Sequence, residues 1–204
     1  MNWMKKVAVA LVCLLPLGLQ AAKVDTLQVK SPSMNKSIEV VVVSPDVAVT
    51  KACPVIYLLH GYGGNARTWV GIKPDLPKIA DEKGIFFVCP DGKNTWYWDS
   101  PLNADVRYET FISDELVKYV DSHYKTVADR KGRAITGLSM GGHGAMWNGL
   151  RHSDVFSAAG STSGGVDIRP FPKNWEMSVQ IGEKAKYPEN WEKYTVINLV
   201  PTLR

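Results

Sequence analysis

Apolar and polar residues are distributed along the chain in blocks that predict strands and helices in turn. Residues 24–29 and 37–44 have the composition of β-strands and are joined by a turn at residues 31–35, so we expect an antiparallel hairpin at a sheet edge. Residues 54–59 and 85–89 are continuous apolar runs, which are typical of strands buried on both faces.

Two helical patterns accompany these strands. Asp75 can cap a helix over residues 76–83, and Gly84 can end it. Further along, apolar residues recur every four positions and predict the buried stripe of an amphipathic helix. The residues of this stripe are Tyr108, Ile112, Leu116, Val120 and Tyr124.

The alternation continues with a strand around residues 133–136, a helix over residues 141–151 and a strand over residues 155–159. It predicts an α/β fold whose sheet is mostly parallel, with right-handed crossovers and helices on both faces. In open α/β sheets the ligand site lies outside the carboxyl ends of the strands. Four polar or glycine-rich segments occupy that edge: residues 60–64, 91–101, 137–141 and 161–165.

The first residues do not belong to this pattern. Lys5 and Lys6 precede an apolar run over residues 7–19 that ends near the small residues Ala21 and Ala22, which predicts a secretory signal peptide over residues 1–22. No second apolar run approaches the ~20 residues of a membrane span. We therefore expect a secreted or periplasmic protein with one domain over residues 23–204 and no integral membrane span after removal of the leader.

Charge and cysteine content narrow the function classes. Loss of Lys5 and Lys6 reduces 24 basic side chains to 22 against 20 acidic ones, so the formal charge falls from +4 to +2, and nothing suggests nucleic acid as a partner. Cys53 enters one predicted strand at its amino end, whereas Cys89 leaves a neighbouring strand at its carboxyl end. Their separation is then about 20 Å, and a disulfide needs Cα atoms within about 7 Å. We expect two free thiols.

The segment Gly137-Leu138-Ser139-Met140-Gly141 has the spacing of a nucleophile elbow. Such a strand-to-helix turn leaves no room for side chains on either flank of its central residue, which explains both glycines. It would raise the Ser139 hydroxyl above the sheet edge as a nucleophile. It would also place the backbone N–H of Met140 at a helix amino terminus, where it can stabilise an oxyanion.

The loop over residues 60–64 can supply the second oxyanion donor, since it follows an earlier buried strand. Its best donor is the backbone N–H of Tyr62, with Gly61 as the alternative. The spacing of its glycines does not match the G-x-G-x-x-G of a dinucleotide site. Neither a metal nor an organic cofactor is implied.

Several segments carry a resemblance to a known family. They are His60-Gly61-Tyr62-Gly63-Gly64, Pro90-Asp91-Gly92, Trp96-Tyr97-Trp98-Asp99-Ser100, Tyr108-Glu109 and Gly137-Leu138-Ser139-Met140-Gly141-Gly142-His143-Gly144-Ala145. Together, over about residues 30–200, they resemble the esterase D family of α/β hydrolases, which includes S-formylglutathione hydrolases, feruloyl and acetyl-xylan esterases and the antigen 85 mycolyltransferases. The resemblance implies a Ser-Asp/Glu-His triad with Ser139 as nucleophile and with Tyr62 and Met140 as oxyanion donors.

The family places its acid and its histidine well after the serine, and this sequence departs from the pattern there. After Ser139 only His143 and His152 remain, the first at a buried structural position of the motif and the second at a helix end. His60 would brace the oxyanion loop and His123 would face solvent. No general base can be assigned, so we expect the hydrolase domain to be incomplete at its C-terminal end, without its last strands, its triad acid and its triad histidine.

Aromatic residues near the predicted cleft are the candidates for substrate binding, since rings supply contact area at little rotamer cost. They are Trp96, Tyr97, Trp98 and Trp175. We expect Glu109 and Asp99 to hold loops instead of moving protons.

The overall interpretation is a secreted serine carboxylic ester hydrolase that acts on small-molecule or carbohydrate esters through an acyl-enzyme. The alternatives are an acyltransferase of the antigen 85 type, and a non-catalytic carbohydrate-binding relative or inactive fragment.

Overall fold

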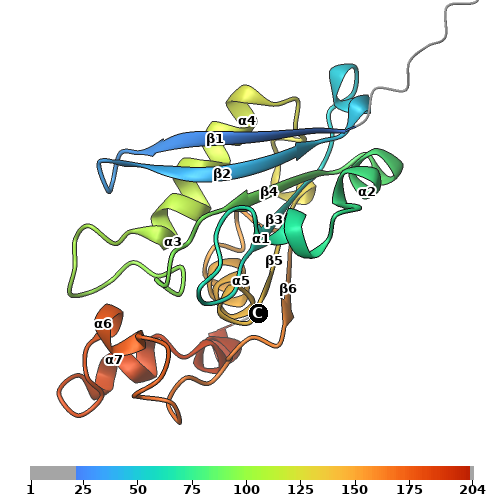
Figure 1. Ribbon diagram of the computed structural model, residues 1–204. Coiled ribbons are helices and arrows are strands. Elements are labelled where there is room, and N and C mark those ends of the chain that lie inside the picture. Colours follow the sequence, from blue (N-terminus) through green and yellow to red (C-terminus); the bar gives the residue numbers. More distant parts are fainter. Residues whose placement is uncertain (1–21, 203–204) are drawn as a thin grey trace, which may run out of the picture.

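A computed structural model describes residues 22–202, so the predicted signal peptide over residues 1–22 lies, except for its last residue, outside the described part. In that part, six strands form one sheet in the order β1-β2-β4-β3-β5-β6 (Figure 1). The strands are β1 (Lys23–Ser31), β2 (Lys36–Ser44), β3 (Val55–Leu59), β4 (Phe86–Pro90), β5 (Arg133–Leu138) and β6 (Ala158–Thr162).

The strand directions match the expected mostly parallel sheet. β1 and β2 form the antiparallel hairpin, and β2 pairs antiparallel with β4. From β4 onward all neighbours are parallel, through β3 and β5 to β6 at the edge. The hairpin therefore extends a parallel sheet of four strands.

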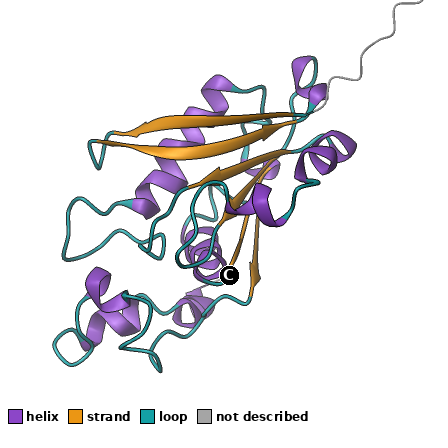
Figure 2. Cartoon of the chain, viewed as in Figure 1, coloured by secondary structure: helices purple, strands orange, loops and turns teal. Residues whose placement is uncertain are grey.

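Helices lie on both sides of the sheet (Figure 2). The α-helices are α1 (Thr68–Ile72), α2 (Leu76–Lys83), α3 (Tyr108–Thr110), α4 (Leu116–His123), α5 (Met140–Arg151), α6 (Met177–Ile181) and α7 (Pro188–Lys193). Short 3-10 turns cover Asp46–Val49, Arg130–Gly132 and Val196–Thr202, and a π-turn over Phe111–Glu115 joins α3 to α4.

Alternating side chains of the strands build two separate cores. Val40 and Val42 of β2 pack into the larger core, with α4 and α5, whereas Val41 and Val43 pack into the smaller one, with α2. Successive side chains of a strand point to opposite faces of the sheet. Because both faces are buried here, the strands are continuous apolar runs in the sequence.

The long amphipathic helix is present, with a modification. Tyr108, Ile112, Leu116 and Val120 are all buried, as their four-residue spacing predicts. Tyr124, the fifth residue of the predicted stripe, lies just past the end of α4 in an extended conformation and is only half-buried. A π-turn over Phe111–Glu115 widens the helix between α3 and α4, a feature that apolar spacing alone does not reveal.

Two expectations at element ends were wrong. The side chain of Asp75 makes no capping hydrogen bond to α2, because it accepts one from Lys73 Nζ at 2.8 Å instead. The last strand begins at Ala158, not at Val155. The chain first turns back on His152 O through the N–H groups of Val155 and Phe156, and buries the Phe156 ring.

Cys53 and Cys89 are buried free thiols, as expected. Cys53 lies just before β3 and Cys89 near the end of the parallel strand β4, so the two lie toward opposite ends of these strands. Over residues 22–202, no helix has the length and apolarity needed to cross a membrane.

Candidate active site

Ser139 occupies a strained turn between β5 and α5. Its backbone is left-handed, with φ 54° and ψ −116°, a conformation that costs a non-glycine residue on the order of 1–3 kcal/mol. A Cβ on Gly137 would lie 2.2 Å from Gly141 O, and one on Gly141 would lie 2.2 Å from Leu59 O. Only glycine fits on either flank, and the Ser139 side chain remains exposed.

The loop after β3 lies against this turn. A Cβ on Gly61 would be 3.5 Å from the Cβ of Ser139, so the backbone of residues 60–62 runs beside the serine. Within residues 22–202, neither the N–H of Tyr62 nor that of Met140 donates to a backbone or side-chain acceptor. Two unpaired N–H groups beside a serine are what an oxyanion hole requires.

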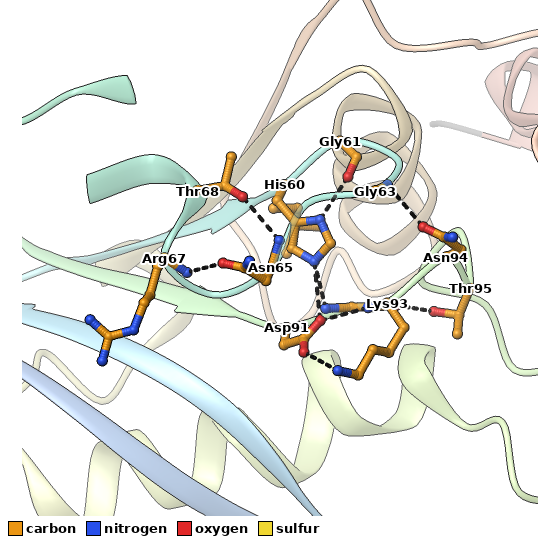
Figure 3. A network of polar contacts seen from close by, with 12 residues as sticks. His60, Gly61, Gly63, Asn65, Arg67, Thr68, Asp91, Lys93, Asn94 and Thr95 are labelled. Atoms are coloured by element: carbon orange, nitrogen blue, oxygen red, sulfur yellow. Dashed lines mark hydrogen bonds and ion pairs between the residues drawn. The ribbon is translucent and has the colours of Figure 1, made fainter. Parts of the chain in front are cut away.

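His60 fixes the shape of this loop (Figure 3). Its ring is buried, with Nδ1 donating to Gly61 O at 2.7 Å and Nε2 accepting from the N–H of Gly92 at 2.9 Å. The Tyr97 hydroxyl donates to His60 O at 3.0 Å, and the N–H of Gly63 donates to Asn94 Oδ1 at 2.9 Å. His60 is therefore a brace, with both ring nitrogens used.

Asp91 completes the brace from β4. One carboxylate oxygen lies 2.6 Å from Lys93 Nζ, and the other accepts from the N–H of Lys93 and lies 3.5 Å from His60 Nε2. Burial opposes ionisation, but the ammonium and the backbone N–H of Lys93 lower the pKa of Asp91 to about 2. The carboxylate therefore stays charged at neutral pH and holds the start of the loop after β4 through Lys93.

Ser139 opens into a cavity of about 290 Å³. Its wall is mainly apolar and comes from the elbow, from the loops after β3 and β4, and from the segment between β6 and α6. The lining residues are Tyr62, Trp96, Ser139, Met140, Ser163, Gly165, Asp167, Ile168, Phe171, Trp175 and Met177. The structure therefore brings Ser139, Met140, Tyr62, Trp96 and Trp175 together.

Tyr97 and Trp98, the other two candidate substrate contacts, lie elsewhere. Both are fully buried and neither lines the cavity. The Tyr97 hydroxyl holds the backbone of His60, and the Trp98 ring stacks on the Trp96 ring with centroids 5.6 Å apart. These two residues belong to the packing behind the wall, so we do not include them in the site.

His143 also supports the wall. Its Nδ1 donates to Gly165 O at 2.7 Å, and its Nε2 accepts from Trp98 Nε1 at 2.9 Å. Burial lowers the pKa of His143 to about 4, although the hydrogen bond to Gly165 opposes this shift. A neutral His143 therefore ties α5 to the cavity wall and has no nitrogen free for Ser139.

The remaining histidines are engaged far from the serine. His152 hydrogen-bonds Glu109 Oε1 at 2.9 Å at the opposite end of α5 from Ser139, and 12 helical residues span about 18 Å. His123 is exposed and stacks on Tyr119. Asp99 accepts from the N–H and hydroxyl of Thr110, so it holds a loop as expected.

Two polar groups at the cavity mouth were not assigned from the sequence. Burial and the nearby carboxylate of Glu176 raise the pKa of the Tyr62 hydroxyl. The carboxylate of Asp167 is paired with Arg169 at 2.8 Å, which lowers the pKa of Asp167. Arg169 also binds Glu192 of α7 at 2.8 Å, so this pair fixes the cavity wall to α7.

Part of the wall could not have been found from motifs. Ser163 and Gly165 belong to residues 161–165, which the topology had already placed at the carboxyl edge of the sheet, and both line the cavity. Ile168, Phe171 and Met177 come from an irregular segment that no periodic pattern marks. In the described part of the chain, no group of three or more His, Cys, Asp or Glu is placed to hold a metal ion.

A left-handed serine between a strand and a helix, at the carboxyl edge of a mostly parallel sheet, is the arrangement of an α/β hydrolase. Residues 31–203 match a family described as "Putative esterase". The chain therefore belongs to this esterase family.

Individual relatives agree with this assignment. Esterase Rv1288 of Mycobacterium tuberculosis is 33% identical over 123 residues, which cover 57% of this chain and 26% of that protein. The structure of a ferulic acid esterase superposes with a TM-score of 0.70 at 28% identity, covering 91% of this chain and 73% of that one. An S-formylglutathione hydrolase of Agrobacterium tumefaciens shares the fold, with a TM-score of 0.74 at 22% identity over 89% of this chain and 72% of that one. The chain spans about a quarter of the length of the first relative.

Proposed function

We propose that the protein hydrolyses carboxylic esters through an acyl-enzyme on Ser139. The observation that carries the proposal is the exposed, left-handed Ser139 beside the unpaired N–H groups of Met140 and Tyr62. Attack of the serine oxygen on the ester carbonyl forms a tetrahedral oxyanion that both N–H groups can stabilise, with Gly61 as the alternative donor. The alcohol leaves, and water releases the acid.

The cavity suggests which part of the ester binds beside Ser139. The cavity wall is mainly apolar and includes Trp96, Ile168, Phe171, Trp175 and Met177. Such a wall favours an aromatic or aliphatic acyl group over a charged one. Similarity to a ferulic acid esterase supports the same class of acyl group. We further propose that the protein is exported, because of the signal-peptide pattern over residues 1–22.

A fluorophosphonate probe tests the nucleophile. We expect mass spectrometry to find the probe on Ser139 and to find none on Ser139→Ala. Ser163→Ala is the matched control, since Ser163 lines the same cavity and also has a positive φ of 54°. Labelling of Ser163, or unchanged ester hydrolysis by Ser139→Ala, would refute the proposal.

The group that accepts the proton of Ser139 needs a separate proposal. The sequence contains four histidines, and each ring is hydrogen-bonded to a partner other than Ser139. We propose that the triad histidine and its acid come from a segment that these 204 residues do not include. Residues 23–204 alone would then retain only the ~10³-fold to 10⁴-fold acceleration over water that an oxyanion hole and binding provide.

Turnover of p-nitrophenyl acetate tests this second proposal. The protein purified from its source is compared, per folded molecule, with residues 23–204 expressed alone. We expect the shorter form to be slower by two orders of magnitude or more. Equal rates would instead place the base among the four histidines.

The occupied histidines also favour a second candidate function, a carbohydrate-binding relative that has the cleft and no turnover. In that case the protein from its source would bind saccharides but would hydrolyse no activated ester.

A further inference from the structure

A second cavity of about 390 Å³ lies at the same edge of the sheet, toward the β1-β2 hairpin. It shares with the Ser139 cavity the loops that follow β3 and β4: Tyr62 and Trp96 line the first cavity, whereas Asn65, Arg67, Asp91 and Lys93 line the second. The proposed hydrolysis makes no use of this second cavity.

The floor is a polar patch on the hairpin. Gln28 lies directly opposite Glu39 in the antiparallel register, and Ser37 lies two residues before Glu39 on the same face. Further along β2 the same face carries Val41 and Val43, which are buried in the core that contains α2. The face therefore changes from apolar to polar where the cavity begins.

The walls carry charges of both signs. Arg67 extends from the loop after β3 toward the hairpin (Figure 3), where its guanidinium donates to Thr26 Oγ1 at 3.0 Å and lies 4.0 Å from Glu39. On the other side, Lys93 lies 2.6 Å from the buried carboxylate of Asp91. Two cations and two carboxylates leave no net charge.

The lining chemistry selects the kind of ligand. An apolar ligand would separate these polar groups from water without offering them hydrogen bonds. The carboxylates of Glu39 and Asp91 would repel a simple anion, and the side chains of Arg67 and Lys93 would repel a simple cation. Sugar hydroxyls both donate and accept hydrogen bonds, so they match carboxylates, amides and cations at once.

We propose that this second cavity binds a neutral carbohydrate, as a short oligosaccharide or as the saccharide part of an ester. For the ester, the inference rests on the proposed function, because the acyl group would then occupy the Ser139 cavity. The two cavities are also linked through His60, which lies 3.5 Å from Asp91 and hydrogen-bonds Gly61 beside Ser139.

Calorimetric titration with xylotriose tests the site without any turnover. We expect saturable binding that weakens about tenfold in Arg67→Ala, which loses hydrogen bonds from a charged group, and a few-fold in Gln28→Ala. Both side chains are exposed, so the variants should fold, and circular dichroism checks this. Lys78→Ala on α2 is the matched control for loss of an exposed cation, since Lys78 is 74% exposed.

A second arm separates this site from the Ser139 cavity. Protein whose Ser139 carries the fluorophosphonate, or Ser139→Ala if labelling fails, should bind xylotriose as the unmodified protein does. Three results would overturn the inference. They are no saturable binding by the parent protein, parent-like affinity in both Arg67→Ala and Gln28→Ala, and loss of binding when Ser139 is modified. Binding of glucuronate without binding of xylotriose would also overturn it, because the site would then select an anion.

Discussion

At the scale of single residues, the elbow combines a strained serine with two glycines that leave it space. The Cβ of an alanine at position 141 would lie 2.2 Å from Leu59 O, a backbone atom of a buried strand that cannot move away. The cost of this contact adds to the strain already present at Ser139.

We therefore expect Gly141→Ala to destabilise the protein by about 3 kcal/mol or more. Urea denaturation, followed by circular dichroism, measures the change. Gly71→Ala in α1 is the control, because a Cβ there meets nothing within 4 Å and alanine favours a helix. A similar loss in both variants would show that the close approach at the elbow is not the cause.

His143 makes stability depend on pH. Its pKa is about 4 in the folded protein, below the ordinary 6.5, so between these values the unfolded chain binds a proton that the folded chain does not. Stability must then fall as the pH falls from about 6.5 to about 4, by roughly 3 kcal/mol in total. The lowered pKa of Asp91 adds a separate loss only between about pH 4 and pH 2.

Substitution of His143 by Gln should remove the first of these two losses. Glutamine can still donate to Gly165 O and accept from Trp98, yet it does not titrate. We expect denaturation midpoints of the variant to change little between pH 6.5 and pH 4.5, whereas those of the parent protein decline. His123→Gln, at an exposed position, should keep the parent profile, and a parent profile in His143→Gln would contradict the assignment.

At the scale of elements, α3 is joined to the end of α5 by one buried carboxylate. Glu109 accepts from Trp147 Nε1 at 2.8 Å, Arg151 Nε at 2.7 Å and His152 Nε2 at 2.9 Å. Burial opposes its ionisation, but these donors lower the pKa of Glu109. Three donors on one carboxylate make Glu109 the main polar link between the two helices.

Glu109→Gln should destabilise the protein by about 1–2 kcal/mol, because Trp147, Arg151 and His152 would face a neutral acceptor in place of a charged one. Fluorophosphonate labelling of Ser139 at 20 °C should keep its rate, since the link lies about 18 Å along α5 from the serine. Thermal denaturation and labelling are measured on the same sample. A slower labelling rate in folded Glu109→Gln would indicate that the link acts on the elbow.

Periodicity predicted most elements, and local competition explains where it failed. Strands of the parallel sheet were recognised because burial of both faces requires continuous apolar runs. The start of β6 was missed, because Val155 and Phe156 have strand-like side chains but their N–H groups bind His152 O. Asp75 was assigned a capping role on sequence position alone, while a neighbouring lysine competes for its carboxylate.

At the scale of the whole molecule, the site is assembled from segments far apart in sequence. Motif spacing was enough to predict that Ser139, Met140 and Tyr62 lie at one cavity, because each belongs to a short turn that adjacent residues determine. The aromatic residues were harder, since Trp96 and Trp98 share a motif but only Trp96 reaches the cavity. Which face a loop residue presents depends on long-range packing, and the wall over residues 163–177 follows no periodic pattern.

The sheet order also governs the thiols. Cys53 and Cys89 are buried and free, and burial raises the pKa of both, so the reactive thiolate is scarce. We expect two alkylated cysteines when residues 23–204 are denatured without reductant and treated with iodoacetamide. The native protein should react far more slowly. A linked peptide pair in the mass spectrum would contradict the strand order.

Trp175 has a further consequence for experiments. Its ring lines the Ser139 cavity and remains 46% exposed, while Trp147 and Trp191 are enclosed in the core. Indole emission moves to shorter wavelength when water leaves the ring, so an acyl group entering the cavity should shift the fluorescence of the unlabelled protein. The molecule thus carries its own optical reporter of occupancy in the wall of the cavity, and Trp147 and Trp191, which do not line it, supply a constant background.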